Sequence, residues 1–403
     1  MRLTTAFNKL LSLPGAWVRR VAFGHDHITI GVVPRRRRHS CPRCHFETSA
    51  GYDRRTCRWR HVALGKWAVV VEAELTRVSC PEHGVLLERV AWAAPSSRFT
   101  LDFEDLVTWL AREMNLTAVT RLAHVSWRAV SHIVARVVDR KLDKDRLDAL
   151  FSIGIDEVSY RKGHKYMSVV VSHATGTPVW IGERRSRETI GKFFDALGPD
   201  RASRLTLVSM DMCGAFIEEV RSRAPQAIIA FDPFHVVQLA NEAVHELRRS
   251  EARTHKGTAY AEALKGTRWA LLKAPENLTA VEEARLAEVS RINRRVYRGY
   301  LLKEELRALY TCSPRSAPHH LDAWLRWAAR SRLQPFTRLA RTLKGYRDGI
   351  LAAIYWGVSN SKLEGINNRI GVLKHRAYGF HSAAALIAMV FLCCSKLPVE
   401  LPI

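Results

Sequence analysis

The 403-residue sequence predicts a mixed α/β fold, in which a catalytic core with a large helical insertion follows small accessory domains. Three observations support this prediction. Cysteines and a histidine stand at metal-ligand spacing near the start of the chain. From residue 151 onward, strand-like segments alternate with helix-like segments. Three acidic residues, Asp156, Asp211 and Glu364, lie where such a fold can aim their carboxylates at one point.

The composition favours a polyanionic partner. The chain has 63 Lys and Arg against 39 Asp and Glu, which gives a formal net charge of +24. When so basic a protein binds DNA, the released counterions contribute to affinity. The most apolar stretch, AAALIAMVFLCC at residues 383–394, is shorter than the roughly 20 residues that cross a bilayer and predicts a buried helix. We see no secretory signal and no disulfide framework, so a cytoplasmic, nucleoid-associated protein is expected.

Residues 1–95 are predicted to be an N-terminal region with a small zinc ribbon. Two knuckles, each containing Cys-Pro, are joined by the alternating, strand-like segment WAVVVEAELTRV. The ligands at tetrahedral-site spacing are Cys41, Cys44, Cys80 and His83. This pattern favours one structural Zn²⁺ over free thiols. A spare thiol and two weaker candidates for a substitute ligand are Cys57, His45 and His61.

Residues 96–145 are predicted to be a helix-turn-helix DNA-binding region. Within residues 116–138 a first helix is expected to end near Ala123, and the recognition helix is expected over Trp127–Val138. The side chains expected to face a major groove are Arg128, Ser131, His132 and Arg136. Two ordinary packed helices are the alternative, and the basic surroundings favour DNA. Further DNA contacts are predicted at Arg35, Arg36, Arg37 and Arg38, and at Lys374, His375 and Arg376.

Residues 146–400 are predicted to form the catalytic domain. Three consecutive strand-like runs, FSIGIDEV, KYMSVVVSH and TPVWIGE, precede alternating helices and strands that include LTLVSMD and AIIAFD. This order is typical of an RNase H-like sheet, although other α/β folds share parts of it. At about residues 240–355 the sequence becomes helical and rich in Arg and Trp, which predicts an insertion before the last helix.

The three acids point to a two-metal site. Asp156 and Asp211 each follow a strand-like run, and Glu364 lies in the helix that opens SNSKLEGINN, on a polar face shared with Asn367. Carboxylate oxygens suit Mg²⁺ or Mn²⁺, and two such ions stabilise both oxygens of a phosphoryl transfer. Asp232 is the rival third ligand, but Pro233 and the following helix favour an N-capping or site-lining role for it.

Four long segments stand out along the chain: GIDEVSYRKGHKY, SMDMCGAF, FDPFHVVQLANEA and SNSKLEGINNRIGVLKHRAYGF. These segments resemble the ISL-three family of insertion-sequence DDE transposases. The resemblance implies an RNase H-like core with a helical insertion, and a catalytic triad of Asp156, Asp211 and Glu364. It also implies cleavage at terminal inverted repeats and joining of the freed 3′-OH ends to target DNA. A zinc-binding CPxC segment and a helix-turn-helix also belong to the family pattern, although the second knuckle here reads CPEH rather than CxxC.

Cutting of two element ends together implies a homodimer or a larger assembly on DNA. Two alternatives remain open: a DNA-binding regulator derived from an inactive transposase, and a RuvC-like nuclease that cleaves branched DNA. The complete acidic triad favours the active transposase over the regulator, because nothing else would keep three carboxylates converging.

Overall fold

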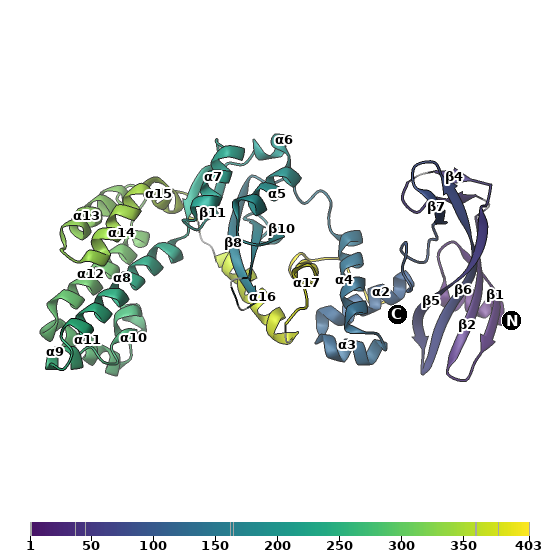
Figure 1. Cartoon of the computed structure of the whole chain (residues 1–403), viewed down its shortest axis with the longest axis horizontal. Coiled ribbons are helices and arrows are strands. Elements are labelled where there is room, and N and C mark those ends of the chain that lie inside the picture. Colours follow the sequence, from purple (N-terminus) through teal and green to yellow (C-terminus); the bar gives the residue numbers. More distant parts are fainter. Residues whose placement is uncertain are drawn as a thin grey trace. The chain divides into compact units, whose positions relative to one another are not determined.

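The computed structural model describes residues 2–36, 38–44, 46–161, 163, 165–358, 361–377 and 379–402. The chain divides into two compact units (Figure 1). The first comprises residues 1–142 together with 375–403, and the second comprises residues 143–374. The sequence placed the segment after residue 374 in the catalytic domain, whereas here it belongs with the N-terminal unit.

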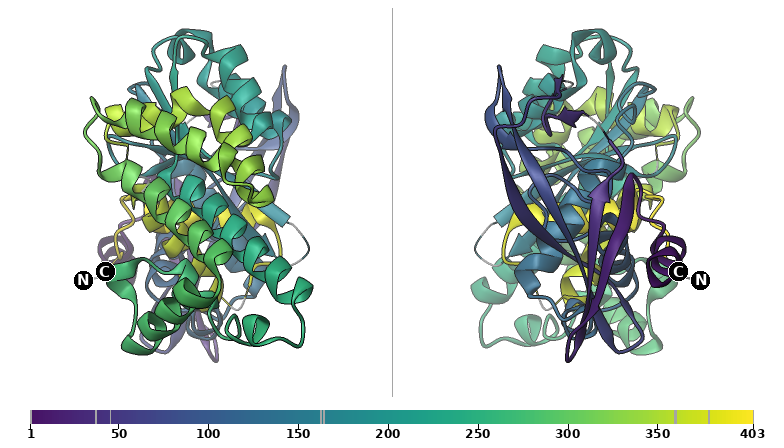
Figure 2. Two further views of the ribbon diagram at one scale, coloured as in Figure 1. Left: turned by 90° about the vertical axis from the view of Figure 1, so that its left-hand side faces the viewer. Right: turned by 90° about the vertical axis from the view of Figure 1, so that its right-hand side faces the viewer.

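The first unit contains a larger sheet than the small ribbon that the sequence predicts. Its strands run in the order β1-β2-β6-β5, with β7 on the free part of β6, and their long twisted course is visible at the right of Figure 2. The elements are α1 (Leu3–Leu11), β1 (Ala16–Phe23), β2 (His27–Pro34), β5 (Asp53–Leu64), β6 (Trp67–Cys80) and β7 (Gly84–Leu87). Alternate side chains of β6, including Val69, Val71 and Leu75, are buried against α1 and Trp92. A separate hairpin of β3 (His39–Ser40) and β4 (Glu47–Thr48) carries the first knuckle.

Four helices complete the first unit. They are α2 (Leu101–Glu113), α3 (Leu116–Ala123), α4 (Trp127–Lys141) and α17 (Ala383–Cys394). α4 packs against α2, α3 and α17. The apolar segment 383–394 is therefore a buried helix, as predicted. Among the described residues, no helix combines the length and the apolar character needed to cross a bilayer.

The second unit is built on a five-stranded sheet with the order β10-β9-β8-β11-β12. Its strands are β8 (Ser152–Arg161), β9 (Lys165–Ser172), β10 (Pro178–Glu183), β11 (Leu207–Met210) and β12 (Ile228–Phe231). β9 is antiparallel to both of its neighbours, β8 and β10, and β11 and β12 are parallel to β8. Helices packed on this sheet are α5 (Arg187–Leu197), α6 (Pro199–Ala202), α7 (Gly214–Arg223) and α16 (Ser361–Arg376). Ile153 and Ile155 of β8 share a core with Phe193 of α5 and Phe216 of α7.

A wholly helical segment separates β12 from α16, as the sequence predicts. Its long helices pack side by side and appear in green at the left of Figure 2. They are α8 (Pro233–Thr254), α11 (Ala280–Ile292), α12 (Arg294–Ala308), α13 (Ala317–Arg330), α14 (Gln334–Gly345) and α15 (Arg347–Tyr355). Short turns of helix lie between them: α9 (Ala259–Glu262), α10 (Arg268–Leu272), η1 (Pro275–Asn277) and η2 (Leu309–Thr311). Trp324 is buried in this bundle, where its indole N–H donates to the Leu302 carbonyl across 2.7 Å.

Candidate active site

Asp156 and Asp211 meet at one edge of the second sheet. β8 and β11 are parallel neighbours, paired from Ser152 with Leu207 to Gly154 with Ser209, so the two acids follow the paired segments at the same edge. The sequence placed Asp156 at the end of its strand, but β8 continues to Arg161 through its pairing with β9. Asp156 therefore extends beyond β11 while its backbone stays fixed by β9.

His235 joins these two carboxylates, and the sequence did not predict its role. One ligand atom from each of Asp156, Asp211 and His235 lies within 4.8 Å of the others, which makes this a group able to hold a metal ion. Nε2 of His235 lies 2.6 Å from Oδ1 of Asp211 and 3.8 Å from Oδ2 of Asp232. In the sequence, the spacing of FDPFH could have indicated this role. A residue three positions after an N-cap lies in the first turn of the helix, next to the capping side chain.

Asp232 has the N-capping role that the sequence favoured. Its side chain accepts a hydrogen bond from the backbone N–H of Phe234 across 2.9 Å, with Pro233 in the first turn of α8. The residue is almost fully buried. Asp232 thus starts the helix that carries His235 and lies next to that side chain.

α16 docks closely against β8 and brings an amide to the site. The Nδ2 of Asn367 donates to Oδ2 of Asp156 across 2.5 Å. Close docking is possible because β8 has a glycine here: a Cβ on Gly154 would lie 2.2 Å from Cδ1 of Leu363. Lys362 also donates to the carbonyl of His173 across 2.5 Å. Three residues of α16 thus hold the helix on the sheet through contacts with β8 and with the residue after β9.

Glu364, the predicted third ligand, lies on the exposed surface of α16. It stands one turn before Asn367 and therefore on the same side of the helix. Among the described residues, the group within 4.8 Å contains His235 and not Glu364. The structure thus brings Asp156 and Asp211 together and leaves Glu364 beside them on the neighbouring helix.

The site gathers more negative charge than its partners neutralise. Burial and repulsion from Asp211 raise the pKa of Asp156. Burial likewise raises the pKa of Glu157 to about 7, an effect that Arg185 opposes and the neighbouring aspartates reinforce. Burial lowers the pKa of His235, but its hydrogen bond to Asp211 and the surrounding carboxylates outweigh this and raise it overall. A bound cation would relieve this repulsion between carboxylates.

The four predicted zinc ligands converge in the first unit. Their ligand atoms lie within 4.8 Å of one another. Sγ of Cys44 is 3.6 Å from Sγ of Cys80, and Nδ1 of His83 is 3.6 Å from Cys80 and 3.9 Å from Cys41. A tetrahedral zinc site with Zn–S of about 2.3 Å and Zn–N of about 2.0 Å has edges of roughly 3.6–3.8 Å. Donor set and spacing therefore fit Zn²⁺. Cys57 and His61 lie outside this group, and His45 lies outside the described residues.

The predicted helix-turn-helix is present. Asn115 caps α3, Ser126 caps α4, and His124 between them adopts the left-handed conformation. The recognition helix begins at Trp127 as predicted and continues to Lys141. Arg128 and His132 are exposed, and Ser131 is half-buried. Arg136 was expected to project toward DNA, but it turns inward and donates to Glu104, whose side chain is fully buried.

The remaining basic residues divide between free and engaged side chains. Arg35 stacks on Trp17 at 3.9 Å from the ring centroid, Arg36 donates to Ser40, and Arg38 is exposed. Arg37 lies outside the described residues.

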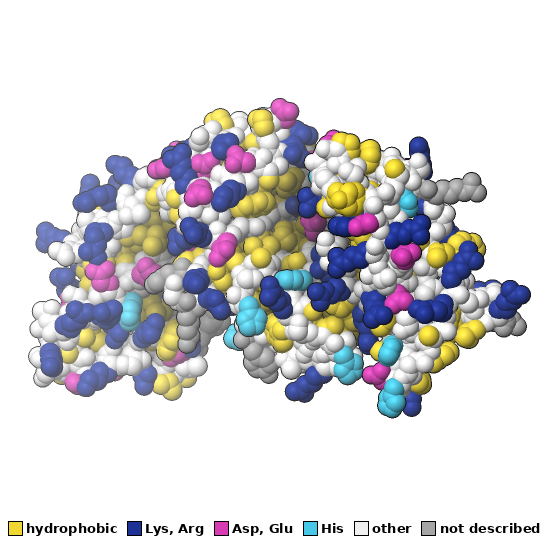
Figure 3. Space-filling model, turned by 45° about the vertical axis from the view of Figure 1, so that its right-hand side comes forward, with side chains coloured by type: hydrophobic (Ala, Val, Ile, Leu, Met, Phe, Trp, Pro, Cys, Tyr) yellow, Lys and Arg dark blue, Asp and Glu magenta, His cyan; other side chains and the backbone are white. Residues whose placement is uncertain are grey.

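Lys374 donates to the carbonyl of Ser159, and Arg376 donates to the last carbonyls of α2, so both have structural partners. His375 is exposed. On the face shown in Figure 3, Lys and Arg are more widespread than acidic side chains.

Comparison with known proteins gives consistent matches along the chain. A transposase family model matches residues 153–390, and the model for the helix-turn-helix domain of transposase family ISL3 matches residues 88–138. The transposase for insertion sequence element IS1557 of Mycobacterium tuberculosis is 40% identical over 377 residues, which cover 87% of this chain and 85% of that protein. The transposase for insertion sequence element IS1001 of Bordetella parapertussis is 31% identical over 392 residues, or 92% of this chain and 94% of that protein.

Proposed function

The chain belongs to the ISL3 family of insertion-sequence transposases, and from that premise we propose how it cuts and joins DNA. It is a DNA-binding enzyme that catalyses DNA cleavage and strand transfer. We propose that its substrate is the terminal inverted repeat of its own mobile element, read by the helix-turn-helix with the help of the zinc-bearing knuckles. A homodimer or larger assembly on DNA, in the cytoplasm at the nucleoid, would bring two ends together.

The catalytic core is proposed to be RNase H-like. Support comes from the sheet of the second unit, in which three antiparallel strands are followed by two parallel ones in the order β10-β9-β8-β11-β12. The matched region of residues 153–390 spans this sheet, the helical segment and α16. The proposed insertion is the helical segment between β12 and α16.

Asp156, Asp211 and Glu364 are proposed to hold two Mg²⁺ or Mn²⁺ ions. Support comes from the oxygen donors, which suit these ions, and from the carbonyl oxygen of the Asn367 side chain, which is buried without a hydrogen-bond partner among the described residues. When bound, the ions activate the attacking oxygen and stabilise the charge on phosphorus oxygens. Asn367 orients Asp156, and His235 orients Asp211.

The two chemical steps require no covalent bond to the protein. Attack by water on the phosphodiester at the element end breaks the bond to the 3′ oxygen and leaves a free 3′-OH. That hydroxyl then attacks a target phosphodiester, forms the new ester and releases a target 3′-OH. The protein holds the reacting phosphate in line with the attacking oxygen, because in-line attack depends on geometry.

The observation that carries this proposal is the convergence of Asp156 and Asp211 within the matched family region. It is tested with a labelled duplex that carries the inverted repeat flanking the gene, incubated with the protein and Mg²⁺ or Mn²⁺. Cleavage at the repeat end is expected for the wild type, and none for Asp211→Asn or Glu364→Gln. Glu283→Gln, a change at an exposed acid of α11 in the helical segment, serves as the control. Wild-type cutting by Glu364→Gln would remove Glu364 from the proposed triad, and equal cutting of branched DNA without the repeat would favour a junction nuclease.

A further inference from the structure

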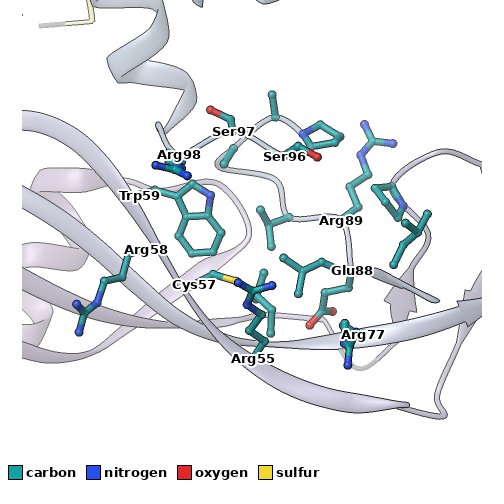
Figure 4. A pocket seen from close by; sticks show the side chains of 18 of the residues that line it. Arg55, Cys57, Arg58, Trp59, Arg77, Glu88, Arg89, Ser96, Ser97 and Arg98 are labelled. Carbon is teal, nitrogen blue, oxygen red and sulfur yellow. The ribbon is translucent and has the colours of Figure 1, made fainter. Parts of the chain in front are cut away.

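A cavity of about 600 Å³ opens on the first unit, between β5, β6, β7 and the segment 88–98 that leads into α2 (Figure 4). Six arginines and one acid, Glu88, are among the residues that line it. The arginines are Arg43, Arg55, Arg58, Arg77, Arg89 and Arg98. We call this cavity the arginine groove. Its charge is strongly one-sided.

Glu88 is the only acid among the described residues that line the groove, and it already has partners. Glu88 accepts from the backbone N–H of Thr76 across 2.7 Å, and its other oxygen lies 2.8 Å from Nδ1 of His39. It is buried, so little of its carboxylate is open to a ligand in the groove. Asp53 and Glu72, which lie outside the groove, pair with Arg77 and Arg58. These two arginines are therefore engaged in ion pairs, and Arg58 shares Glu72 with Arg20.

The other four arginines are uncompensated. Arg43, Arg55, Arg89 and Arg98 are exposed and form no ion pair with any described residue. Four free guanidinium groups around one concave surface make a strong positive potential, because low-dielectric walls focus the field. Guanidinium groups bind phosphate oxygens in a bidentate manner. The groove therefore suits a ligand with several phosphates.

The groove is tied to the recognition helix. Ser97 on its wall donates to Oε1 of Glu104 across 2.7 Å, and Arg136 of α4 donates to the same oxygen across 2.6 Å. On the other side, the backbone N–H of Arg60 donates to the carbonyl of Arg98 across 2.8 Å. Arg136 and Ser97 thus share the fully buried carboxylate of Glu104, and this contact fixes α4 relative to the groove wall.

We propose that the arginine groove binds the phosphate backbone of the duplex whose major groove receives α4, which extends the footprint beyond the helix-turn-helix. This inference rests on the proposed function. Duplex DNA is favoured over a single strand because Trp59, the one aromatic side chain among the described residues that line the groove, is buried against Trp92 and offers no face for base stacking. The contact reads no bases, so it adds affinity to any sequence next to the recognised site.

The test removes two free arginines, in the variant Arg55→Gln/Arg98→Gln. A matched control, Arg20→Gln/Arg54→Gln, removes the same charge from arginines of the same sheet that pair with Glu72 and Glu74 outside the groove. Fluorescence anisotropy measures binding to two duplexes that carry the flanking repeat. One has about 12 base pairs, enough for a single helix-turn-helix half-site, and the other has about 35. Thermal unfolding and zinc content verify that both variants are folded.

On the long duplex the groove variant should bind about tenfold more weakly, and the slope of log K against log salt should fall by about 2, one for each lost phosphate contact. On the short duplex it should match the wild type, and the control should match the wild type on both. Equal binding of the groove variant and the control to the long duplex would overturn the proposal. So would an equal loss on single-stranded DNA or RNA. The variant Arg128→Ala/His132→Ala separates the two inferences, since its unchanged preference for the repeat would instead contradict the predicted reading by α4.

Discussion

Asn367 on α16 donates a hydrogen bond to Asp156 on β8 across 2.5 Å, although the two residues are 211 positions apart in the sequence. The contact links the last helix of the second unit to the first strand of its sheet. It also fixes one oxygen of the Asp156 carboxylate and leaves the other free to accept from the backbone N–H of Glu157. The helical segment between β12 and α16 must therefore fold so that α16 returns to the sheet.

Asn367→Ala should weaken metal binding and DNA cleavage by about 10- to 100-fold, because second-shell partners orient the ligating carboxylate. Titration calorimetry with Mn²⁺ measures the first effect, and single-turnover cleavage measures the second. Asn368→Ala is the control, since Asn368 is the exposed neighbour on the same helix. Equal Mn²⁺ affinity of the two variants would contradict an orienting role for Asn367.

His235→Gln should flatten the pH dependence of stability in metal-free protein. The pKa of His235 is raised in the folded state, so its protonation stabilises the fold below the pKa of an unfolded histidine. That contribution disappears as pH rises through the higher folded pKa. As the pH rises from about 6.5, the ordinary pKa of histidine, through the higher folded pKa, the wild type should therefore lose more stability than the variant. Urea unfolding in EDTA at each pH measures this, with His375→Gln, an exposed histidine, as the control. Parallel curves for wild type and variant would exclude the effect.

The first unit should contain one zinc ion per chain, measured by metal analysis of the purified protein. Cys80→Ser should lose the zinc and lower the thermal stability of the first unit, because the site closes β6 onto the hairpin of β3 and β4. His83→Cys should keep the zinc, since a thiolate suits the same tetrahedral position. Cys57→Ser should also keep it, because Cys57 lies outside the group. Loss of zinc from Cys57→Ser would mean that the ligand set differs.

Gly154→Ala should destabilise the second unit by about 1–3 kcal/mol, because the added methyl overlaps Leu363 and forces α16 away from β8. Leu363→Ala alone should also cost stability, since Leu363 is buried. The double variant should recover part of the loss and should cut DNA better than Gly154→Ala. Chemical unfolding and cleavage rates measure both effects. Additive losses in the double variant would show that the overlap with Leu363 is not the cause.

Local patterns in the sequence predicted the elements that local physics determines. Asn115 and Ser126 are N-caps, and the apolar spacing between them and Val138 defines two helices without reference to the rest of the chain. The N-terminal sheet was harder, because β1 carries a bulge after Val18 and β5 places arginines on both faces. Neither strand shows the simple alternation that identifies a strand in a sequence.

Site residues were predictable only where the residue type limited its role. Acids after strand-like runs predicted that Asp156 and Asp211 lie together, and the spacing of three cysteines and a histidine predicted that the proposed zinc ligands converge. His235 and Arg136 could not be placed, because their partners come from other elements. An arginine on a recognition helix is usually a DNA contact, and only the fully buried Glu104 in α2 turns this one inward. Contacts between distant segments thus determined the roles of His235 and Arg136, which local sequence patterns did not predict.

The packing of α17 on α4 has a consequence for the order of synthesis. The ribosome makes α4 early, and it makes α17 only after all of residues 143–374. Until α17 emerges, the side of α4 that it covers has no partner from this helix. A nascent or truncated chain that lacks α17 therefore carries an incompletely packed recognition helix. We therefore expect the DNA-binding region to complete its folding last, after the catalytic domain has been translated.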